Sequence, residues 1–404
     1  MARLLFITSR LPWPPREGHQ LRSWHLLRAL AARHEVHLLS FERRDDHAEG
    51  LLRLAGETAA AEAFPIPAEH SPVALATALL RGTTGARPVV AWKYHSPLLR
   101  TRVRDVLPGF DAVHVDMLPL VANLATPVDR PLVINAHNVE HALLQRRVET
   151  EHSPWRRRFL ATQVPRLRAF EVAAWRRADL VLACSHDDAE VIRAHAPHTR
   201  VQVIPNGVDL DANRPDPATR PAPEALVFVG QMGWFPNRDG IEWFLAEVFP
   251  RIVAARPGAR LCVVGKTDGF TVPAALAGRV RMTGFVADVR PAVHEAGVYV
   301  VPLRAGSGTR LKVLEAMALG KAIVTTSIGS AGIALQPGRD ALFADEPGAF
   351  ADAVLALMAD PARAGELGAS ARAVAEARYG WTAIGESLAC AYDSLLASRM
   401  ARQR

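Results

Sequence analysis

The segment at residues 300–326, with the sequence VVPLRAGSGTRLKVLEAMALGKAIVTT, constrains the fold of this chain more than any other. It begins within an apolar run at residues 298–301, passes through a glycine-rich loop and continues into strong helix formers from about residue 311 to 319. Gly320 closes this helix, and a second apolar run begins at Ala322. The first turn of a helix has free backbone N–H groups, so the pattern predicts a strand–loop–helix–strand unit with an anion site at the helix start.

Three charged residues follow this loop, at the start of the predicted helix. Arg310 and Lys312 offer positive charge suited to a phosphate, and Glu315 offers a carboxylate that can accept hydrogen bonds from sugar hydroxyls. The alternative is that the glycines form only a tight turn and the charged residues a solvated helix face. The presence of all three charged side chains together at the start of the helix favours a binding site. The loop residues assigned to the same site are Gly306, Ser307, Gly308 and Thr309. Together they predict a site for a sugar nucleotide rather than for a bare phosphate.

Composition sets the limits of the interpretation. A chain of 404 residues with 49% apolar and 22% charged residues is expected to form two globular domains. No apolar run is long enough for a spanning helix, and the N-terminus is interpreted as a first strand rather than a signal peptide. Three widely spaced cysteines indicate neither a disulfide framework nor a metal cluster, so we expect a reducing, cytoplasmic compartment.

The net charge of +7 does not by itself indicate a nucleic-acid partner. Only four of the 48 basic residues are lysines, a bias typical of a whole coding sequence, and no nucleic-acid-binding motif accompanies them. Two of those lysines, Lys266 and Lys312, lie near the expected donor loops.

Apolar runs and helical segments alternate along the whole chain, which favours parallel α/β sheets. We predict domains at residues 1–204 and 225–380, a proline-rich linker at 205–224 and a final amphipathic helix within 381–404. Strands are predicted at residues 3–8, 36–41, 111–115, 132–135, 180–184, 201–204, 225–229, 260–264, 280–282, 298–301 and 322–325.

The segment at 300–326 resembles the signature of the retaining glycosyltransferases of family 4, which carry an LEAMAxGxPVV run. The resemblance implies that Glu315 binds the donor ribose and that Arg310 and Lys312 bind the diphosphate. The usual motif has a first glutamate where this chain has Ser307, a departure shared by branches with a GxGxRxK form. How the donor sugar ring is held is therefore left open.

Similarity to this family extends along most of the chain, through VIPNGVD at 203–209 and LVFVGQMGWFPNRDGIEWF at 226–244. It implies the α/β GT-B fold: two facing Rossmann-like domains with a cleft between them and a C-terminal helix that returns to the first domain. Gln231 and Asn237 stand near positions where the family usually has an Arg and a Lys on the diphosphate. Gly230, Gln231 and Lys266 are assigned to the donor side.

Two motifs in the first half, PPREGHQLR at 14–22 and INAHNVEHALL at 134–144, resemble sugar transferases found with bacterial exopolysaccharide and exosortase systems. Gly18 lies in a loop that the family places near phosphates and acceptor, and a plain helix-start glycine is the alternative. His137 follows a strand, where α/β sheets bind ligands, and the family has a His there close to the donor sugar. Further candidates are Asn138, Glu140 and Asp116, whereas His141 can equally be a solvated helix residue.

The resemblance implies a retaining glycosyltransferase of the hexosyltransferase type, with a UDP- or GDP-sugar as donor substrate and no cofactor. The acceptor is expected to be a saccharide or a polyprenyl-linked sugar, in exopolysaccharide or cell-surface glycan synthesis. No DxD motif or Asp/His cluster marks a metal site, so protein cations are expected to stabilise the leaving diphosphate. A nonhydrolysing sugar-nucleotide epimerase and a catalytically silent sugar-nucleotide-binding protein remain as alternatives.

A basic region at residues 146–177 carries nine arginines against three acids, with aromatic residues between them. Such a region suits a reversible contact with anionic lipid at the inner face of the membrane, which the family resemblance favours. The alternative is a solvated helix with its aromatics in the core, and we expect Pro154 and Pro165 to interrupt any long amphipathic face.

Overall fold

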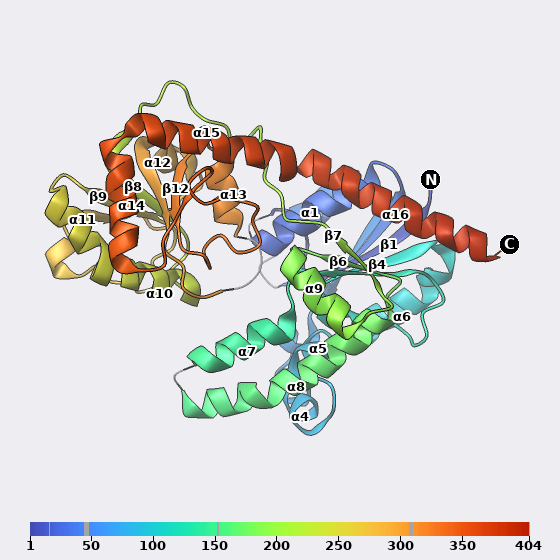
Figure 1. Cartoon of the computed structure of the whole chain (residues 1–404). Coiled ribbons are helices and arrows are strands. Elements are labelled where there is room, and N and C mark those ends of the chain that lie inside the picture. The colour runs from blue at the N-terminus through green and yellow to red at the C-terminus, as the bar shows by residue number, and fades with distance from the viewer. Residues whose placement is uncertain (16, 44–47, 152, 307–309, 404) are drawn as a thin grey trace. The chain divides into compact units, whose positions relative to one another are not determined.

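The computed structural model describes residues 1–15, 17–43, 48–151, 153–306 and 310–403. The chain forms two compact units, one of Met1–Pro205 with Thr382–Arg404 and one of Asn206–Trp381 (Figure 1). The segment predicted as a linker, 205–224, enters the second unit from Asn206 onward. The first strand of that unit begins at Ala222 rather than at residue 225.

The first unit is built on a seven-stranded parallel sheet in the order β3-β2-β1-β4-β5-β6-β7. Helices cover both faces of such a sheet, so its central strands are continuous apolar runs, and every residue of β4 and β5 is buried. The strands are β1 (Arg3–Thr8), β2 (Glu35–Glu42), β3 (Ala60–Pro65), β4 (Ala112–Asp116), β5 (Leu132–Ala136), β6 (Leu180–Ala183) and β7 (Arg200–Val203).

Ten helices belong to the described part of this unit, and α7 and α8 lie side by side as a pair (Figure 1). They are α1 (Gly18–Ala31), α2 (Ala48–Glu57), α3 (Pro67–His70), α4 (Pro72–Thr84), α5 (Val89–Lys93), α6 (Pro97–Val106), α7 (Glu140–Thr150), α8 (Pro154–Arg177), α9 (His186–His195) and α16 (Trp381–Gln403). Short 3₁₀ turns occur at η1 (Leu107–Gly109) and η2 (Leu118–Asn123).

The C-terminal helix α16 packs on the first unit, as the family resemblance implied. Its Tyr392 is fully buried, and the hydroxyl lies 2.6 Å from Nδ1 of His114 on β4. The His114 ring stacks in turn on Phe6 of β1, with ring centroids 4.1 Å apart. This contact fixes the end of the chain against the central strands of the sheet.

The second unit has a six-stranded parallel sheet in the order β10-β9-β8-β11-β12-β13. Its strands are β8 (Ala222–Val229), β9 (Arg260–Val264), β10 (Val280–Met282), β11 (Ala296–Val301), β12 (Ala322–Thr325) and β13 (Leu342–Phe343). The helical elements are α10 (Phe235–Trp243), the π-helical turn η3 (Phe244–Val248), α11 (Phe249–Ala255), the 3₁₀ turn η4 (Ala274–Leu276), α12 (Arg290–Glu295), α13 (Leu311–Ala318), α14 (Pro347–Ala359) and α15 (Pro361–Arg378).

Three expectations differ from the structure. The sequence did not predict β3, which is alanine-rich, or β13, which has two residues, because neither forms a clear run of β-branched side chains. Pro165, expected to interrupt any long amphipathic face, does not end the helix, because α8 runs through it as one helix of 24 residues. Pro154 begins that helix, a position where its missing N–H costs nothing. Among the described residues, none of the helices combines the length and apolarity needed to cross a bilayer.

Candidate functional site

The predicted strand–loop–helix–strand unit is present in the second unit as β11, a loop, α13 and β12. Arg310 is the N-cap of α13 and is buried, with an exposed fraction of 9%. Gly306 has a positive φ of 127°, and a Cβ at this position would lie 2.9 Å from Nη2 of Arg310. Glycine is therefore required where the loop passes over the guanidinium. The predicted loop residues Ser307, Gly308 and Thr309 lie outside the described residues.

Lys312 is held in place by a residue from a different strand–helix connection. Its ammonium donates to Oδ1 of Asn237 at 2.6 Å and lies 4.2 Å from the ring centroid of Phe228. The Asn237 amide also donates to the backbone oxygen of Gln231 at 2.9 Å. A Cβ at Gly230 would lie 2.7 Å from Nζ of Lys312, so glycine leaves room for the ammonium in this position. The loop after β8 and the start of α13 thus form one site.

Burial perturbs both titratable side chains on α13. Desolvation, followed by the nearby Arg310, lowers the pKa of Lys312 to about 7. Desolvation raises the pKa of Glu315 to about 7, and the positive charge of Lys312 opposes that rise. Perturbed groups that gather at the carboxyl ends of parallel strands are typical of functional sites.

The other predicted donor-side residues are Gln231, Lys266 and Gly230, which lie in the loops after β8 and β9. Gln231 contributes its backbone oxygen to Asn237, and its side chain is exposed. Lys266 follows β9 with an exposed side chain, its Nζ 6.0 Å from the ring centroid of Phe285. Gly230 donates its N–H to Val264, which joins the loops after β8 and β9.

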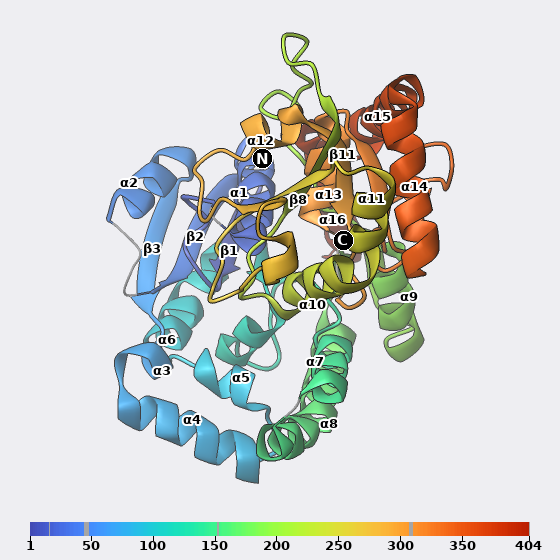
Figure 2. The same cartoon turned by 90° about the vertical axis from the view of Figure 1, so that its left-hand side faces the viewer.

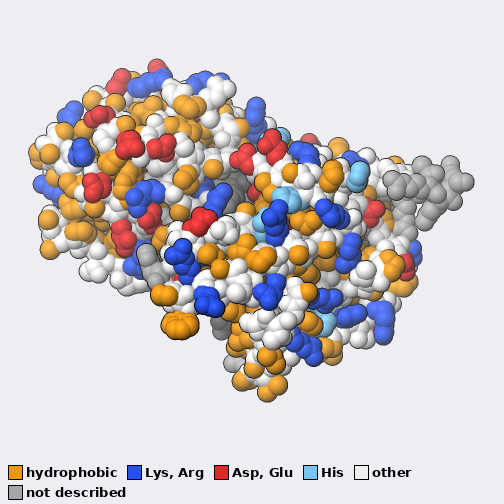
Figure 3. Space-filling view, turned by 60° about the horizontal axis from the view of Figure 1, so that its bottom comes forward, with side chains coloured by type: hydrophobic (Ala, Val, Ile, Leu, Met, Phe, Trp, Pro, Cys, Tyr) orange, Lys and Arg blue, Asp and Glu red, His pale blue; other side chains and the backbone are white. Residues whose placement is uncertain are grey.

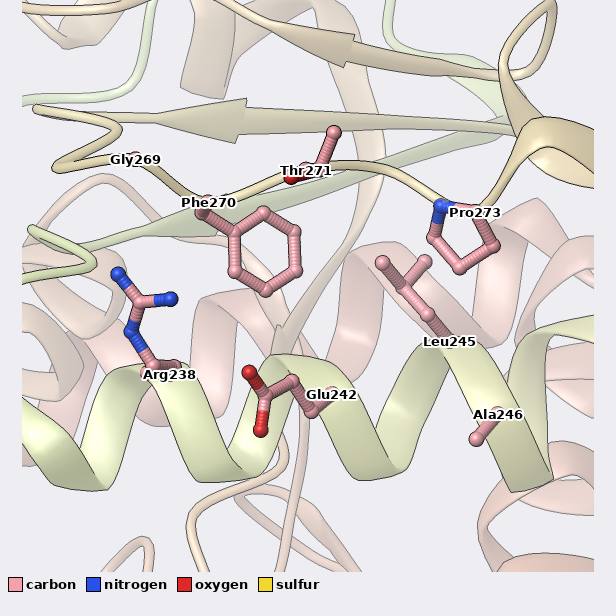
Figure 4. A pocket seen from close by; sticks show the side chains of 8 residues that line it. All are labelled: Arg238, Glu242, Leu245, Ala246, Gly269, Phe270, Thr271 and Pro273. Carbon is pink, nitrogen blue, oxygen red and sulfur yellow. The ribbon is translucent and has the colours of Figure 1, made fainter.

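Arg238, the neighbour of Asn237, lines a different place. It donates to the backbone oxygens of Met232 at 3.1 Å and Asp268 at 2.7 Å. Figure 4 shows it at one end of a shallow groove between α10 and the loop that carries Phe270. Arg238 is therefore not a third cation beside Lys312.

In the first unit, His137 pairs with a buried carboxylate. Its Nε2 lies 2.8 Å from Oδ1 of Asp116, which is 1% exposed. Because a carboxylate only accepts, Nε2 carries the proton in this assignment. Burial alone would raise the pKa of Asp116, but His137 and His114 hold it well below its usual value. Asp116 therefore orients His137.

A buried polar network supports this pair. Asp116 also accepts from the Ser23 hydroxyl and from Nδ2 of Asn135 at 2.5 Å. Asn135 accepts in turn from Arg22, at 3.1 Å from Nε and 2.8 Å from Nη2. Arg22 is 1% exposed and also donates to the backbone oxygen of Pro205 at 3.0 Å. Ser23, Arg22 and Asn135 were not predicted as site residues. Arg22 and Asn135 lie in the two family-like motifs, which is the only sequence signal for them.

Gly18 is the first residue of α1, which follows the carboxyl end of β1. The N-cap Glu17 forms a capping box with Gln20, so the local sequence accounts for the helix start. Burial, followed by the proximity of His137, lowers the pKa of His19 to about 4. His19 is therefore neutral at physiological pH and lies beside His137.

The remaining candidates of this motif lie at the start of α7. Asn138 hydrogen-bonds the Glu140 carboxyl, and burial followed by Glu171 raises the pKa of Glu140 to about 7. Glu171 of α8 is fully buried and accepts the backbone N–H groups of Glu140 at 2.9 Å and His141 at 3.1 Å. Nδ1 of His141 lies 2.5 Å from the same carboxylate, so His141 helps to anchor α7 on α8 and is not a solvated residue.

Within the part of the chain that the structure describes, no group of three or more His, Cys, Asp or Glu side chains is arranged to hold a metal ion.

Known proteins resemble this chain in sequence along most of its length. Residues 17–212 match the family described as Glycosyltransferase Family 4, and residues 223–360 match Glycosyl transferases group 1. A glycogen synthase of Mycobacterium tuberculosis is 30% identical over 312 residues, which are 72% of this chain and 70% of that protein. This chain belongs to glycosyltransferase family 4. A GDP-mannose-dependent phosphatidylinositol monomannoside mannosyltransferase of the same organism is 30% identical over 51% of the chain and 59% of that protein.

Solved structures show the fold of this family 4 glycosyltransferase. A sucrose-phosphate synthase of Thermosynechococcus elongatus matches with a TM-score of 0.70 at 20% identity, over 98% of this chain and all of that one. The Anabaena HepE protein, solved in complex with UDP, matches with a TM-score of 0.67 at 15% identity, over 97% of this chain and all of that one. The two Rossmann-like units are those of the GT-B fold.

Proposed function

We propose that this glycosyltransferase transfers a hexose from a UDP- or GDP-sugar to a saccharide or polyprenyl-linked acceptor, with retention of anomeric configuration. We place the reaction in bacterial exopolysaccharide or cell-surface glycan synthesis, at the inner face of the cell membrane. The proposal requires no cofactor and no metal ion.

The arrangement of Arg310, Lys312 and Glu315 at the start of α13 carries this proposal. Two cations stand beside free N–H groups of the helix, which suits a diphosphate. Glu315 lies one turn further along, where a carboxylate can accept from ribose hydroxyls. The relatives support both bases: HepE is solved with UDP and with UDP-glucose, and the mycobacterial mannosyltransferase is GDP-mannose-dependent.

The chemistry follows from these charges. As the bond from the sugar to the nucleotide breaks, negative charge grows on the leaving diphosphate, and Arg310, Lys312 and the helix start stabilise it. The leaving phosphate can take the acceptor proton on the same face of the sugar, so no carboxylate nucleophile is needed. His137, fixed by Asp116, is proposed to orient the donor sugar.

A panel of UDP- and GDP-sugars, offered with and without saccharide acceptors, tests the proposal. We expect release of UDP or GDP with sugar transfer, or slow donor hydrolysis without acceptor, and NMR of the product should show the donor's anomeric configuration. An epimerised sugar nucleotide, or binding without turnover, would instead establish one of the two alternative functions.

We expect kcat/KM for the donor to peak near pH 7. Lys312, with its lowered pKa, loses its charge as the pH rises above about 7, and Glu315, with its raised pKa, loses its charge below about 7. Lys312→Arg should flatten the alkaline limb, because a guanidinium stays charged, and Glu315→Gln should flatten the acid limb. A wild-type profile that stays level between about pH 6 and 8.5 would show that these groups do not control the reaction.

Turnover is expected to survive chelation. The proposal assigns phosphate stabilisation to protein cations, so activity after dialysis against EDTA should match that of untreated enzyme. Lost activity that magnesium or manganese restores would show that this assignment is wrong.

A further inference from the structure

Helix α4 in the first unit presents large apolar side chains to solvent. The exposed fractions are 74% for Val73, 44% for Leu75, 41% for Leu79 and 64% for Leu80. The buried positions of the helix are the small residues Ala78 and Gly82. Single exposed leucines are common, but a surface helix normally turns its large apolar face inward. The pattern of α4 is therefore the reverse of that expected for a helix covering a core.

The C-terminal end of α4 packs against α5 and α8, and this contact keeps the apolar side chains of α4 directed outward. A Cβ at Gly82 would overlap Val89, so glycine allows α4 to lie directly on the start of α5. Gln163 of α8 donates to the backbone oxygen of Gly82 at 3.1 Å and accepts from the N–H of Val89 at 3.0 Å. Gln163 is itself buried, so α4, α5 and α8 are joined at this point.

Cations without acidic partners surround the same end of α4. The guanidinium carbons of Arg81 and Arg87 lie 5.0 Å and 5.6 Å from the ring centroid of Trp92. Arg166 of α8 donates to the backbone oxygens of Gly85 at 2.9 Å and Thr83 at 2.8 Å. Arg81 and Arg87 are exposed, Arg166 is half-buried, and none of the three forms an ion pair with a described acid. Residues 72–104 contain six Lys or Arg and no Asp or Glu. Three of the six, Lys93, Arg102 and Arg104, pair with acids outside this segment, so the unpaired charge gathers at Arg81 and Arg87.

We propose that this surface, Val73, Leu75, Leu79 and Leu80 with Arg81, Arg87 and Arg166, docks on an anionic lipid bilayer. The apolar side chains of α4 enter the interface between headgroups and acyl chains, and the arginines contact lipid phosphates. Arginine stems also allow the charged heads to reach the headgroups while the helix lies flat.

Charge favours lipid over a protein partner. A continuous segment of one sign beside an apolar helix complements a surface of uniformly negative headgroups. Figure 3, in which the bottom of Figure 1 comes forward, shows orange and blue side chains over the lower part of this unit with few red ones. The membrane contact predicted through α8 has fewer exposed aromatic side chains than expected. Trp155 is 84% exposed beside the exposed Arg156, but Trp175 is fully buried.

Flotation with vesicles tests the proposal on the full chain, without donor or acceptor. Wild-type protein should bind vesicles that contain phosphatidylglycerol, and this binding should weaken at high salt. It should not bind vesicles of pure phosphatidylcholine. The double variant Leu79→Ser/Leu80→Ser should lower the partition coefficient about tenfold or more. Arg81→Gln/Arg87→Gln should lower it several-fold and weaken its salt dependence.

Two controls keep the test decisive. Leu52→Ser removes a leucine that is 73% exposed from α2, at the opposite end of this unit (Figure 2), and should bind like wild type. Leu79→Ile/Leu80→Ile keeps the apolar area and should also bind like wild type. Thermal melts establish that each variant is folded.

Normal binding by folded Leu79→Ser/Leu80→Ser would overturn the proposal, as would equal binding to neutral vesicles. If only replacement of Arg156, Arg157 and Arg158 abolishes binding, the α8 region is the contact and α4 is not. A dimer that the serine variant dissociates, with vesicle binding unchanged, would assign the face to a second copy. The inference deepens the proposed location at the membrane but does not depend on transfer, because binding is measured apart from turnover.

Discussion

Replacing Lys312 with alanine is expected to lower kcat/KM for the nucleotide sugar at least about tenfold, and Glu315→Ala is expected to have a similar effect. Lys312 supplies a charge beside the start of α13, and Glu315 a carboxylate on the same helix. Losing a charge-assisted contact costs about 1.5–3 kcal/mol, which is at least tenfold in rate. Steady-state kinetics with purified variants measure the effect.

The fold should survive both changes, since burial disfavours the charged form of each side chain. Arg260→Ala provides a matched control, because this exposed cation begins β9 at the end of the sheet opposite the loops. Asn237→Ala should act through Lys312 and shift the alkaline limb of the pH profile, a change that a purely structural residue would not cause. Near-normal kinetics for Lys312→Ala or Glu315→Ala would remove the donor-site assignment.

The second large effect is expected for Asp116→Asn. This variant should lower kcat at least about tenfold and reduce the free energy of unfolding by about 3 kcal/mol, because it removes a buried carboxylate that accepts from His137. Three donors, Ser23, Asn135 and His137, would compete for a single amide oxygen. In a unit of this size the melting temperature should fall by about 6–12 °C.

Two further variants separate positioning from stability. His137→Gln should lose activity with a much smaller change in melting temperature. Tyr392→Phe removes the hydrogen bond to His114 and should cost about 1 kcal/mol of stability while kcat stays normal. If folded Asp116→Asn turns over at the wild-type rate well below its melting temperature, the orienting role of Asp116 is refuted.

Local pattern was sufficient for most of the fold. Strands such as β9 (Arg260–Val264) and β12 (Ala322–Thr325) have the predicted bounds, because the buried part of a parallel strand is a run of mostly apolar residues. β3 was missed because the sequence AAEAFP lacks such a run, and its place at the sheet edge comes from pairing with β2.

The donor-side residues were predictable for a similar reason. Arg310, Lys312 and Glu315 lie within two turns, and helix geometry alone fixes their relation. Asn237 is 75 residues before Lys312, and Arg22 is 113 residues before Asn135. Such pairs form only when strands become neighbours in a sheet, an event that no local pattern encodes.

The sequence by itself determined the alternating α/β architecture and the charged helix start at residues 310–315, because both depend on short-range periodicity. Tertiary structure alone decided that Lys312 donates to Asn237 and that burial lowers the pKa of Lys312 to about 7. It also decided that Asp116 orients His137 and that α4 turns its leucines outward. These properties depend on how much water each side chain loses and on which groups replace that water, and both are set by packing between distant elements.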